Sequence, residues 1–250
     1  MRAMISGVLE ASLRTSVRWL ERRMGSRSPI GDQPFFSTDV FPWIPRLEQQ
    51  WTEVRAELDA LLVHRSALPN FQDISARQRE LSDDDNWKTF FFAGYGLRME
   101  KNRELCPRTA ALLDEVPGLT TAFFSILGPG KHLPEHRGPY KGAVRYHLGL
   151  KIPDPASACG IRVGGVTAHW QEGRSLVFDD TYPHEAWNNT TEDRVVLFVD
   201  IVRPLTFPYS LMNNLLMWGI ARSAFIRDAK NAHDAWEQRF EALKDRRPAT

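Results

Sequence analysis

The sequence predicts a mainly β domain, either a sandwich or a barrel, with helices before and after it. Between residues 120 and 202, short runs of apolar or alternating character are separated by glycine and proline turns, a pattern typical of β-strands. On both sides of this region the apolar residues instead recur at helical spacing. A chain of 250 residues is long enough for one such domain to bury a substantial core.

The composition is that of an ordinary globular chain and excludes several classes. Hydrophobic residues make up 42% and charged residues 25%, which excludes a wholly disordered chain. The formal net charge of +1 provides no global basic field, so we expect no nucleic-acid partner. Two cysteines, Cys106 and Cys159, cannot build a disulfide scaffold, and we therefore expect a reducing, cytoplasmic location.

Residues 1–35 are predicted to form an amphipathic helix and a linker. Residues 1–28 contain six arginines and two glutamates, a local net charge of +4. No apolar run approaches the roughly 20 residues that a transmembrane helix needs. Two interpretations stay open: the helix docks on the domain, or it lies on the inner membrane face as a peripheral contact. The apolar positions with helical spacing are Ile5, Val8, Leu9, Leu13, Val17, Leu20 and Met24.

Residues 36–208 are predicted to form the β domain together with its leading helices. Apolar residues from Leu47 to Leu62 predict a helix after Pro45, and residues 104–115 predict a shorter one. The run Val195–Val199 indicates a central, buried strand. From Tyr209 the pattern becomes helical again, so residues 209–250 are predicted as a C-terminal helical extension. The predicted strands are Thr121–Leu127, Ala143–Lys151, Ile161–Val163, Val166–Trp170, Arg174–Phe178 and Arg194–Val202.

One predicted strand carries charged groups on a single face. Because alternate side chains of a strand share a face, Arg145 and His147 point away from Val144, Tyr146 and Leu148. If both faces are covered, a buried Arg145 needs an anionic partner. That partner is either a protein carboxylate or a small acidic ligand.

Two histidines lie close to the ends of these strands. His136 is in a turn-rich segment, and His184 follows the strand that ends at Phe178. A single loop histidine is usually a surface or packing residue, but here arginines lie on the neighbouring strands. Imidazoles ligate Fe, Zn and Cu, and a guanidinium binds a carboxylate through two hydrogen bonds. This combination predicts a metal site that also binds a substrate.

Four segments follow one another in a characteristic order. They are FSILGPGKHLPEHRGPYKGAVRYHLGLKIP (Phe124–Pro153), W-x-E-G (Trp170–Gly173), FDDTYPHEAWN (Phe178–Asn188) and RVVLFVDIVRP (Arg194–Pro204). With these segments, the stretch from Leu105 to about Pro204 resembles the aspartyl/asparaginyl β-hydroxylase family, including its bacterial lipid A 2-hydroxylase branch. The resemblance implies a double-stranded β-helix, also called a jelly-roll or cupin-like fold, and a dioxygenase that uses Fe(II), 2-oxoglutarate and O2.

The resemblance also implies roles for individual residues. His136 and His184 would be the two iron ligands. Arg194, assisted by Ser125, would hold the distal carboxylate of 2-oxoglutarate. The cosubstrate would be contacted near its metal-chelating end by Arg145 and His147.

The chain departs from the wider superfamily at the iron site. Gly138 stands where most relatives have an aspartate ligand, so the resemblance implies two protein ligands, completed by water or a nearby carboxylate. Among Glu135, Asp179 and Asp180, we expect Asp180 to lie next to His184. Gly138 is shared with the animal Asp/Asn hydroxylases, whereas Ala143, which replaces an arginine of the peptide-modifying enzymes, points to the lipid branch.

Three functions follow from the resemblance. The first is hydroxylation of an unactivated C–H bond, principally the β-carbon of an Asp/Asn-type residue in a peptide or a free amino acid. The second is hydroxylation of a lipid-linked acyl chain at the membrane surface, which the amphipathic N-terminal helix and the apolar stretch Leu211–Ile226 favour. The third is a non-catalytic jelly-roll binding module.

Overall fold

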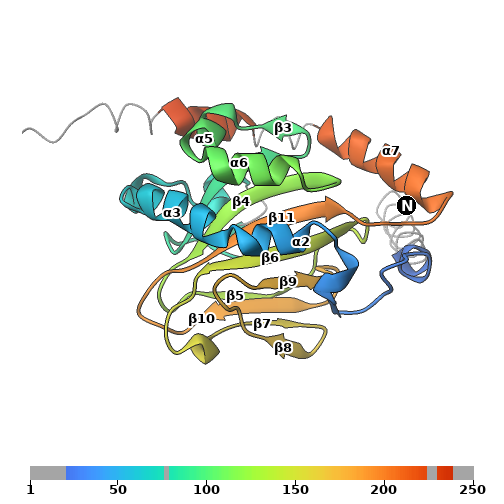
Figure 1. Cartoon of the computed structure of the whole chain (residues 1–250), viewed down its shortest axis with the longest axis horizontal. Coiled ribbons are helices and arrows are strands. Elements are labelled where there is room, and N and C mark those ends of the chain that lie inside the picture. The colour runs from blue at the N-terminus through green and yellow to red at the C-terminus, as the bar shows by residue number, and fades with distance from the viewer. Residues whose placement is uncertain (1–20, 76–78, 224–229, 239–250) are drawn as a thin grey trace, which may run out of the picture.

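A computed structural model of the chain describes residues 21–75, 79–223 and 230–238 and shows two antiparallel β-sheets, with helices covering one of them (Figure 1). The larger sheet has the strand order β1-β9-β6-β11-β4-β2-β3, and the smaller sheet has the order β5-β10-β7-β8. The strands are β1 (Phe35–Phe36), β2 (Trp87–Gly94), β3 (Leu97–Arg98), β4 (Leu119–Leu127), β5 (His132–His136), β6 (Ala143–Lys151), β7 (Cys159–Val163), β8 (Val166–Ala168), β9 (Ser175–Phe178), β10 (His184–Asn188) and β11 (Arg194–Val202).

The chain crosses repeatedly between the two sheets from β4 to β11. Strands β4, β6, β9 and β11 belong to the larger sheet, and β5, β7, β8 and β10 belong to the smaller sheet. In each sheet the first and last of these strands are neighbours, β4 with β11 and β5 with β10. Two interleaved antiparallel sheets of this kind form a jelly roll. The predicted double-stranded β-helix is therefore confirmed.

Helices α2, α3 and α6 pack against the outer face of the larger sheet, whereas Phe71 of α4 packs against its inner face. On β6 the outer face carries Val144, Tyr146 and Leu148, which share one core cluster with Val54 and Leu58 of α3. Arg145 and His147 point to the inner face, as the alternation of the strand predicts. The helices are α2 (Ile44–Gln49), α3 (Trp51–Leu62), α4 (Phe71–Ile74), α5 (Glu100–Leu105), α6 (Pro107–Asp114) and α7 (Tyr209–Ala221), and short 3-10 turns span Thr38–Val40, Arg65–Ala67 and Ala156–Ala158.

All six predicted strands are present, and β6 and β11 have the predicted bounds at both ends. Sequence patterns missed β1, β2 and β3, which precede the predicted strand region, and also β5 and β10, which were expected to be turn or loop. Strand β5 contains Pro134, which is tolerated because β5 lies at the edge of its sheet. Strand β10 begins directly after Pro183 and has little apolar alternation.

The two ends of the chain are described only in part. The predicted N-terminal helix lies mostly in residues 1–20, outside the described residues, although residues 21–26 are helical and Met24 is buried. Near the other end, residues 230–238 are helical and Trp236 packs in the main core cluster. Within the described part of the chain, no helix has the length and apolar character needed to cross a membrane.

Candidate active site

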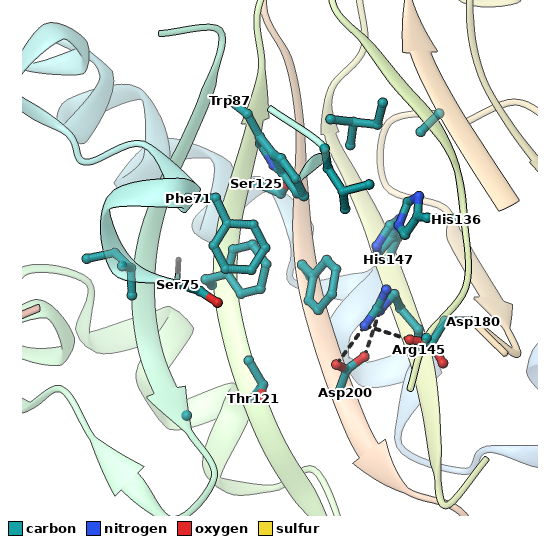
Figure 2. A pocket seen from close by; sticks show the side chains of 18 of the residues that line it. Phe71, Ser75, Trp87, Thr121, Ser125, His136, Arg145, His147, Asp180 and Asp200 are labelled. Atoms are coloured by element: carbon teal, nitrogen blue, oxygen red, sulfur yellow. Dashed lines mark hydrogen bonds and ion pairs between the residues drawn. The ribbon is translucent and has the colours of Figure 1, made fainter. Parts of the chain in front are cut away.

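A cavity of about 370 Å³ lies between the inner face of the larger sheet and the smaller sheet. Figure 2 shows that side chains from both sheets point into it. Strands β4, β6 and β11 provide groups from one side, and β5 and β10 provide groups from the other. The cavity brings together every residue that the sequence singled out for the site: Ser125, His136, Arg145, His147, Asp180, His184 and Arg194.

His136 and His184 lie directly opposite each other on β5 and β10. The centroids of their rings are 4.1 Å apart. Each Nδ1 faces a backbone carbonyl, that of Pro134 at 2.8 Å and that of Tyr182 at 3.0 Å. A carbonyl oxygen can only accept, so each Nδ1 carries the proton and donates it. Each Nε2 therefore keeps a free lone pair, which is the form that binds a metal.

Burial keeps both imidazoles neutral. It lowers the pKa of His136, and the Arg145 guanidinium lowers it further. Burial, together with His136 and Arg145, lowers the pKa of His184 to about 3. Since only a neutral imidazole binds a metal, both side chains are ready to do so at neutral pH without losing a proton.

Gly138 leaves room for the carboxylate of Asp180, which lies in the connection between β9 and β10. The backbone N–H of Gly138 donates to the carbonyl of Asp180 at 2.7 Å, and a Cβ at this glycine would overlap the Asp180 carboxylate. Asp180 therefore occupies the space that a side chain at position 138 would fill. Of the other two carboxylates considered, Asp179 is paired with Arg203 at 2.8 Å and Glu135 is exposed.

Arg145 is bound by two protein carboxylates (Figure 2). Its Nε and Nη2 donate to Asp200 at 2.8 and 3.0 Å, and Nη2 lies 3.0 Å from Asp180. Burial opposes the charge of Arg145, but the two aspartates outweigh it and raise the pKa of the guanidinium. Of the two partners considered for this arginine, the structure contains the protein carboxylate. Its contact with a cosubstrate stays a prediction.

Asp200 is the site residue that the sequence reasoning missed. It lies directly opposite Arg145 in the register of β11 and β6. The available signal was a lone acidic residue within the apolar run of β11. The same carboxylate acts on Asp180: burial, Asp200 and Asp179 raise the pKa of Asp180 to about 6, although Arg145 opposes the shift.

Arg194 is a buried cation that forms no ion pair with a carboxylate among the residues that the structure describes. It is 2% exposed, and neither Nε nor Nη1 has a hydrogen-bond partner among the described residues. Its guanidinium lies 4.4 Å from the ring centroid of Trp170, and burial lowers its pKa to about 10. Burying an uncompensated charge costs several kcal/mol. The geometry around Arg194 is therefore suited to an anionic ligand.

Further polar groups at this end of the cavity also lack partners. Within the described part of the chain, neither ring nitrogen of His147 has a hydrogen bond, and neither does Nε1 of Trp170. Burial, then Arg194 and Arg145, lower the pKa of His147 well below its ordinary value. The hydroxyl of Ser125 accepts a hydrogen bond from Nε1 of Trp87 at 3.1 Å and keeps its own proton to donate. These groups can donate to or accept from a polar ligand.

One wall of the cavity is made of phenylalanine side chains. Phe71, Phe91, Phe123 and Phe198 all line it. The ring of Phe123 is central, with centroids 5.2 Å from Phe71, 4.6 Å from Phe91 and 4.2 Å from Phe198. Such a wall favours an apolar substrate, because contact with it removes apolar surface from water.

The residues present fit an iron centre with two protein ligands. Among residues 21–75, 79–223 and 230–238, no cluster of three or more His, Cys, Asp or Glu side chains could hold a metal. Two neutral imidazoles with free Nε2 atoms suit Fe(II), and they leave positions open for a chelating cosubstrate and for oxygen.

The comparison with known proteins agrees with this geometry. The family model described as aspartyl/asparaginyl β-hydroxylase matches residues 48–204. The chain belongs to the aspartyl/asparaginyl β-hydroxylase family. The predicted family is confirmed, and with it the hydroxylase class. The strands that form the cavity all lie inside the matched range.

Two relatives in this hydroxylase family differ in the substrate that their names give. The chain is 47% identical over 226 residues to an ornithine lipid ester-linked acyl 2-hydroxylase of Rhizobium tropici, covering 90% of this chain and 80% of that protein. It is 32% identical over 196 residues to the human aspartyl/asparaginyl β-hydroxylase, covering 75% of this chain and 25% of that protein. Among solved structures, a Pseudomonas putida prolyl-4-hydroxylase is similar with a TM-score of 0.38 and 19% identity, covering 62% of this chain and 88% of that one.

Proposed function

We propose that this protein is a 2-oxoglutarate- and Fe(II)-dependent hydroxylase that acts on carbon 2 of an ester-linked acyl chain of a lipid. The observation that carries the proposal is the content of one cavity. It combines a pair of neutral histidines, a buried arginine that pairs with no carboxylate in the described part of the chain, and an apolar wall. The histidines and the arginine support the use of Fe(II) and 2-oxoglutarate, and the apolar wall supports an acyl chain as the substrate.

His136 and His184 would hold Fe(II) through their Nε2 atoms, and Asp180 lines the same cavity. Arg194 would bind the distal carboxylate of 2-oxoglutarate, with the Ser125 hydroxyl as a second donor. The absence of a hydrogen-bond partner at Nε and Nη1 of Arg194, among the described residues, supports this role. A dicarboxylate would supply the charge that the buried guanidinium lacks.

When bound, Fe(II) with O2 and 2-oxoglutarate supplies the oxidising chemistry: the cosubstrate loses CO2 and becomes succinate with one oxygen atom, and the other oxygen atom enters the C–H bond. The side chains of this protein position the reactants. The ion pairs of Arg145 with Asp200 and Asp180 hold the strands next to the histidines in place. The phenylalanine wall orients an apolar substrate and keeps water away from the reacting carbon.

Two observations favour an acyl chain as substrate. The first is the similarity to the Rhizobium lipid hydroxylase, which extends over most of both chains. The second is the state of Arg145, which already contacts two carboxylates and so offers little charge to an aspartyl substrate. Hydroxylation of the β-carbon of an Asp or Asn residue is the second candidate, favoured by Gly138 and by the human relative. The sequence-based expectation of an Asp/Asn substrate thus stays a prediction.

Turnover with two substrates tests the proposal. The protein is incubated with Fe(II), 2-oxoglutarate and air, and with either ornithine lipid or an Asp/Asn peptide. Succinate and the gain of one oxygen atom are measured by mass spectrometry. We expect the gain on the lipid acyl chain, and we expect His184→Ala to abolish it.

His132→Ala is the matched control, because His132 also lies on β5 but contacts Glu185 at 2.8 Å outside the cavity. It should retain the activity of the wild type. If only the peptide gains oxygen, the second candidate function, hydroxylation of the β-carbon of Asp or Asn, is correct and the lipid is not the substrate. Succinate no higher than in His184→Ala with either substrate would favour a binding module without turnover.

A further inference from the structure

Helix α7 exposes its apolar side chains and buries a polar one. Asn213 is the one residue of α7 that is fully buried. Leu215 is 61% exposed and Trp218 is 59% exposed, although helices on a protein surface ordinarily turn such residues toward the core. The helix contains no Asp, Glu, Lys or Arg. The exposed large apolar residues of α7 are Leu211, Met212, Leu215, Leu216 and Trp218, and Phe207 lies just before it.

The exposed residues share one side of the helix. At about 100° per residue, the five side chains cover an arc of roughly 160°. Asn213 lies opposite this arc, and its side-chain amide donates to the carbonyl of Gly142 at 2.9 Å. This bond fixes the orientation of α7 and turns its apolar side outward. We call the five residues and Phe207 the α7 face.

Arginines lie at both ends of the α7 face. Arg222 follows the helix, and its guanidinium lies 4.0 Å from the ring centroid of Trp218. At the other end, the backbone N–H and the hydroxyl of Thr206 both donate to the carbonyl of Arg27 at 3.1 Å. Arg22 and Arg27 are exposed on this neighbouring turn. An apolar surface bordered by cations matches an anionic lipid surface.

The C-terminal end of α7 lies close to a turn whose neighbouring residues line the cavity. A Cβ built on Gly96 would lie 4.0 Å from the Cβ of Ala221, the last residue of α7. The neighbouring Tyr95 and Leu97 line the cavity. Figure 1 shows α7 beyond the end of β11.

We propose that the α7 face docks on the surface of an anionic phospholipid bilayer. Trp218, with its amphipathic ring, is typical of the layer between headgroups and acyl chains. A second copy of the chain fits this face less well, because a symmetric contact would bring the bordering arginines of both copies together. The link between docking and acyl-chain hydroxylation rests on the proposed function. Docking on a bilayer does not depend on that function.

Vesicle co-sedimentation of the full chain tests the proposal. Binding is measured to vesicles of mixed phosphatidylcholine and phosphatidylglycerol, and to vesicles of phosphatidylcholine alone. The variant L211S/L215S removes two leucines of the α7 face. The control V63S/V166S removes two other exposed aliphatic residues, which are 79% and 51% exposed and lie on other elements. All four positions are exposed, so neither pair should unfold the protein.

We expect L211S/L215S to bind the anionic vesicles about tenfold more weakly than the wild type, and V63S/V166S to bind as the wild type does. Binding should also weaken on phosphatidylcholine alone and at high salt. Equal affinity of the two double variants would overturn the proposal. So would light scattering that shows a dimer for the wild type and a monomer for L211S/L215S, because the face would then bind a second copy. Neither readout depends on turnover, so failure here is distinguishable from failure of the proposed function.

Discussion

Arg194 and Arg203 lie at the two ends of the β11 segment, and both are buried. Their surroundings differ in one respect. Arg203 donates to Asp179 at 2.8 Å and to the carbonyl of Gly31 at 2.6 Å, so its charge is compensated within the protein. The guanidinium of Arg194 lies over the ring of Trp170, and its Nε and Nη1 have no hydrogen-bond partner among the described residues. A structural arginine and a ligand-binding arginine can therefore be told apart by stability measurements.

We predict that Arg194→Met raises the free energy of unfolding by about 1–4 kcal/mol, because it removes a desolvated cation from the apo protein. The same change should abolish the rise in melting temperature that 2-oxoglutarate produces in the wild type. Arg203→Met is the control and should lower the free energy of unfolding by about 3–5 kcal/mol, because it leaves Asp179 buried without its main partner. Loss of stability in Arg194→Met would show that Arg194 has a structural role instead.

Because the pKa of His147 is lowered, we expect the free energy of unfolding to depend on pH. Its folded-state pKa lies well below the ordinary value of 6.5, because of burial first and then Arg194 and Arg145. Between pH 7 and pH 5 the unfolded chain binds a proton that the folded chain does not, so the free energy of unfolding falls as the pH falls. The loss from this residue is about 2 kcal/mol over that range. Urea unfolding at the two pH values measures it.

His147→Phe should reduce the loss between pH 7 and pH 5 by about that amount. The replacement suits its surroundings, since the ring centroids of Phe178 and Phe198 both lie 5.0 Å from that of His147. If wild type and variant lose the same free energy, the imidazole titrates normally and the assignment of a buried neutral His147 is wrong.

The sequence predicted the candidate site residues better than it predicted their partners. Histidine, arginine and serine at motif spacing can be read directly from the chain, and the cavity contains all of them. The pairing of Arg145 with Asp200 depends on the register between β6 and β11, across 55 residues of sequence. No local pattern encodes that register, and therefore Asp200 was missed.

At the scale of elements, the sequence reasoning missed β1, β2 and β3, and also β5 and β10, the two strands that carry the histidines. Both are short, and both are rich in polar residues or close to proline. Local propensity is weak in such segments, and pairing with neighbouring strands decides their conformation. Strands β6 and β11 were predicted with both bounds correct, because β6 shows a regular alternation of apolar residues and β11 contains a continuous apolar run.

Gly138, in the connection after β5, lies against the carboxylate of Asp180. Gly138→Asp should lower the free energy of unfolding by about 1–3 kcal/mol, because its side chain would overlap the Asp180 carboxylate and place two like charges together. Adding Asp180→Gly should restore part of the loss, since the double variant moves one carboxylate from one position to the other. Chemical denaturation of the two single variants and the double variant measures the coupling.

A positive coupling between the two positions supports a shared space. Purely additive losses would contradict it. Fe(II) affinity, measured by anaerobic calorimetry on the same three variants, gives a second readout. If Asp180 helps to hold the metal or its water, the double variant should bind Fe(II) better than Asp180→Gly alone.

At the scale of the whole molecule, the jelly roll explains why residues so far apart in sequence meet. The chain alternates between the sheets, so its first and last core strands become neighbours. Ser125 on β4 and Arg194 on β11 thereby reach the same cavity as His136 on β5. The class of fold was predictable from the number and spacing of short strands. The choice of a double-stranded β-helix required the resemblance to known hydroxylases, because strand patterns alone fit many β topologies.

The helical segment of residues 230–238 packs onto this fold through Trp236. Trp236 is 5% exposed, packs edge-on against Phe90 with centroids 6.2 Å apart, and donates from Nε1 to the carbonyl of Ala67 at 2.8 Å. Trp236→Ala should therefore lower the free energy of unfolding by about 3–5 kcal/mol, because it leaves a cavity in the main core. Trp218→Ala, which removes a 59% exposed indole of α7, should change it by less than about 0.5 kcal/mol. Urea unfolding followed by far-UV circular dichroism compares the two. A loss below about 1 kcal/mol for Trp236→Ala would contradict the packing and make residues 230–238 an appendage, whereas the expected loss makes them part of the cooperative fold that encloses the cavity.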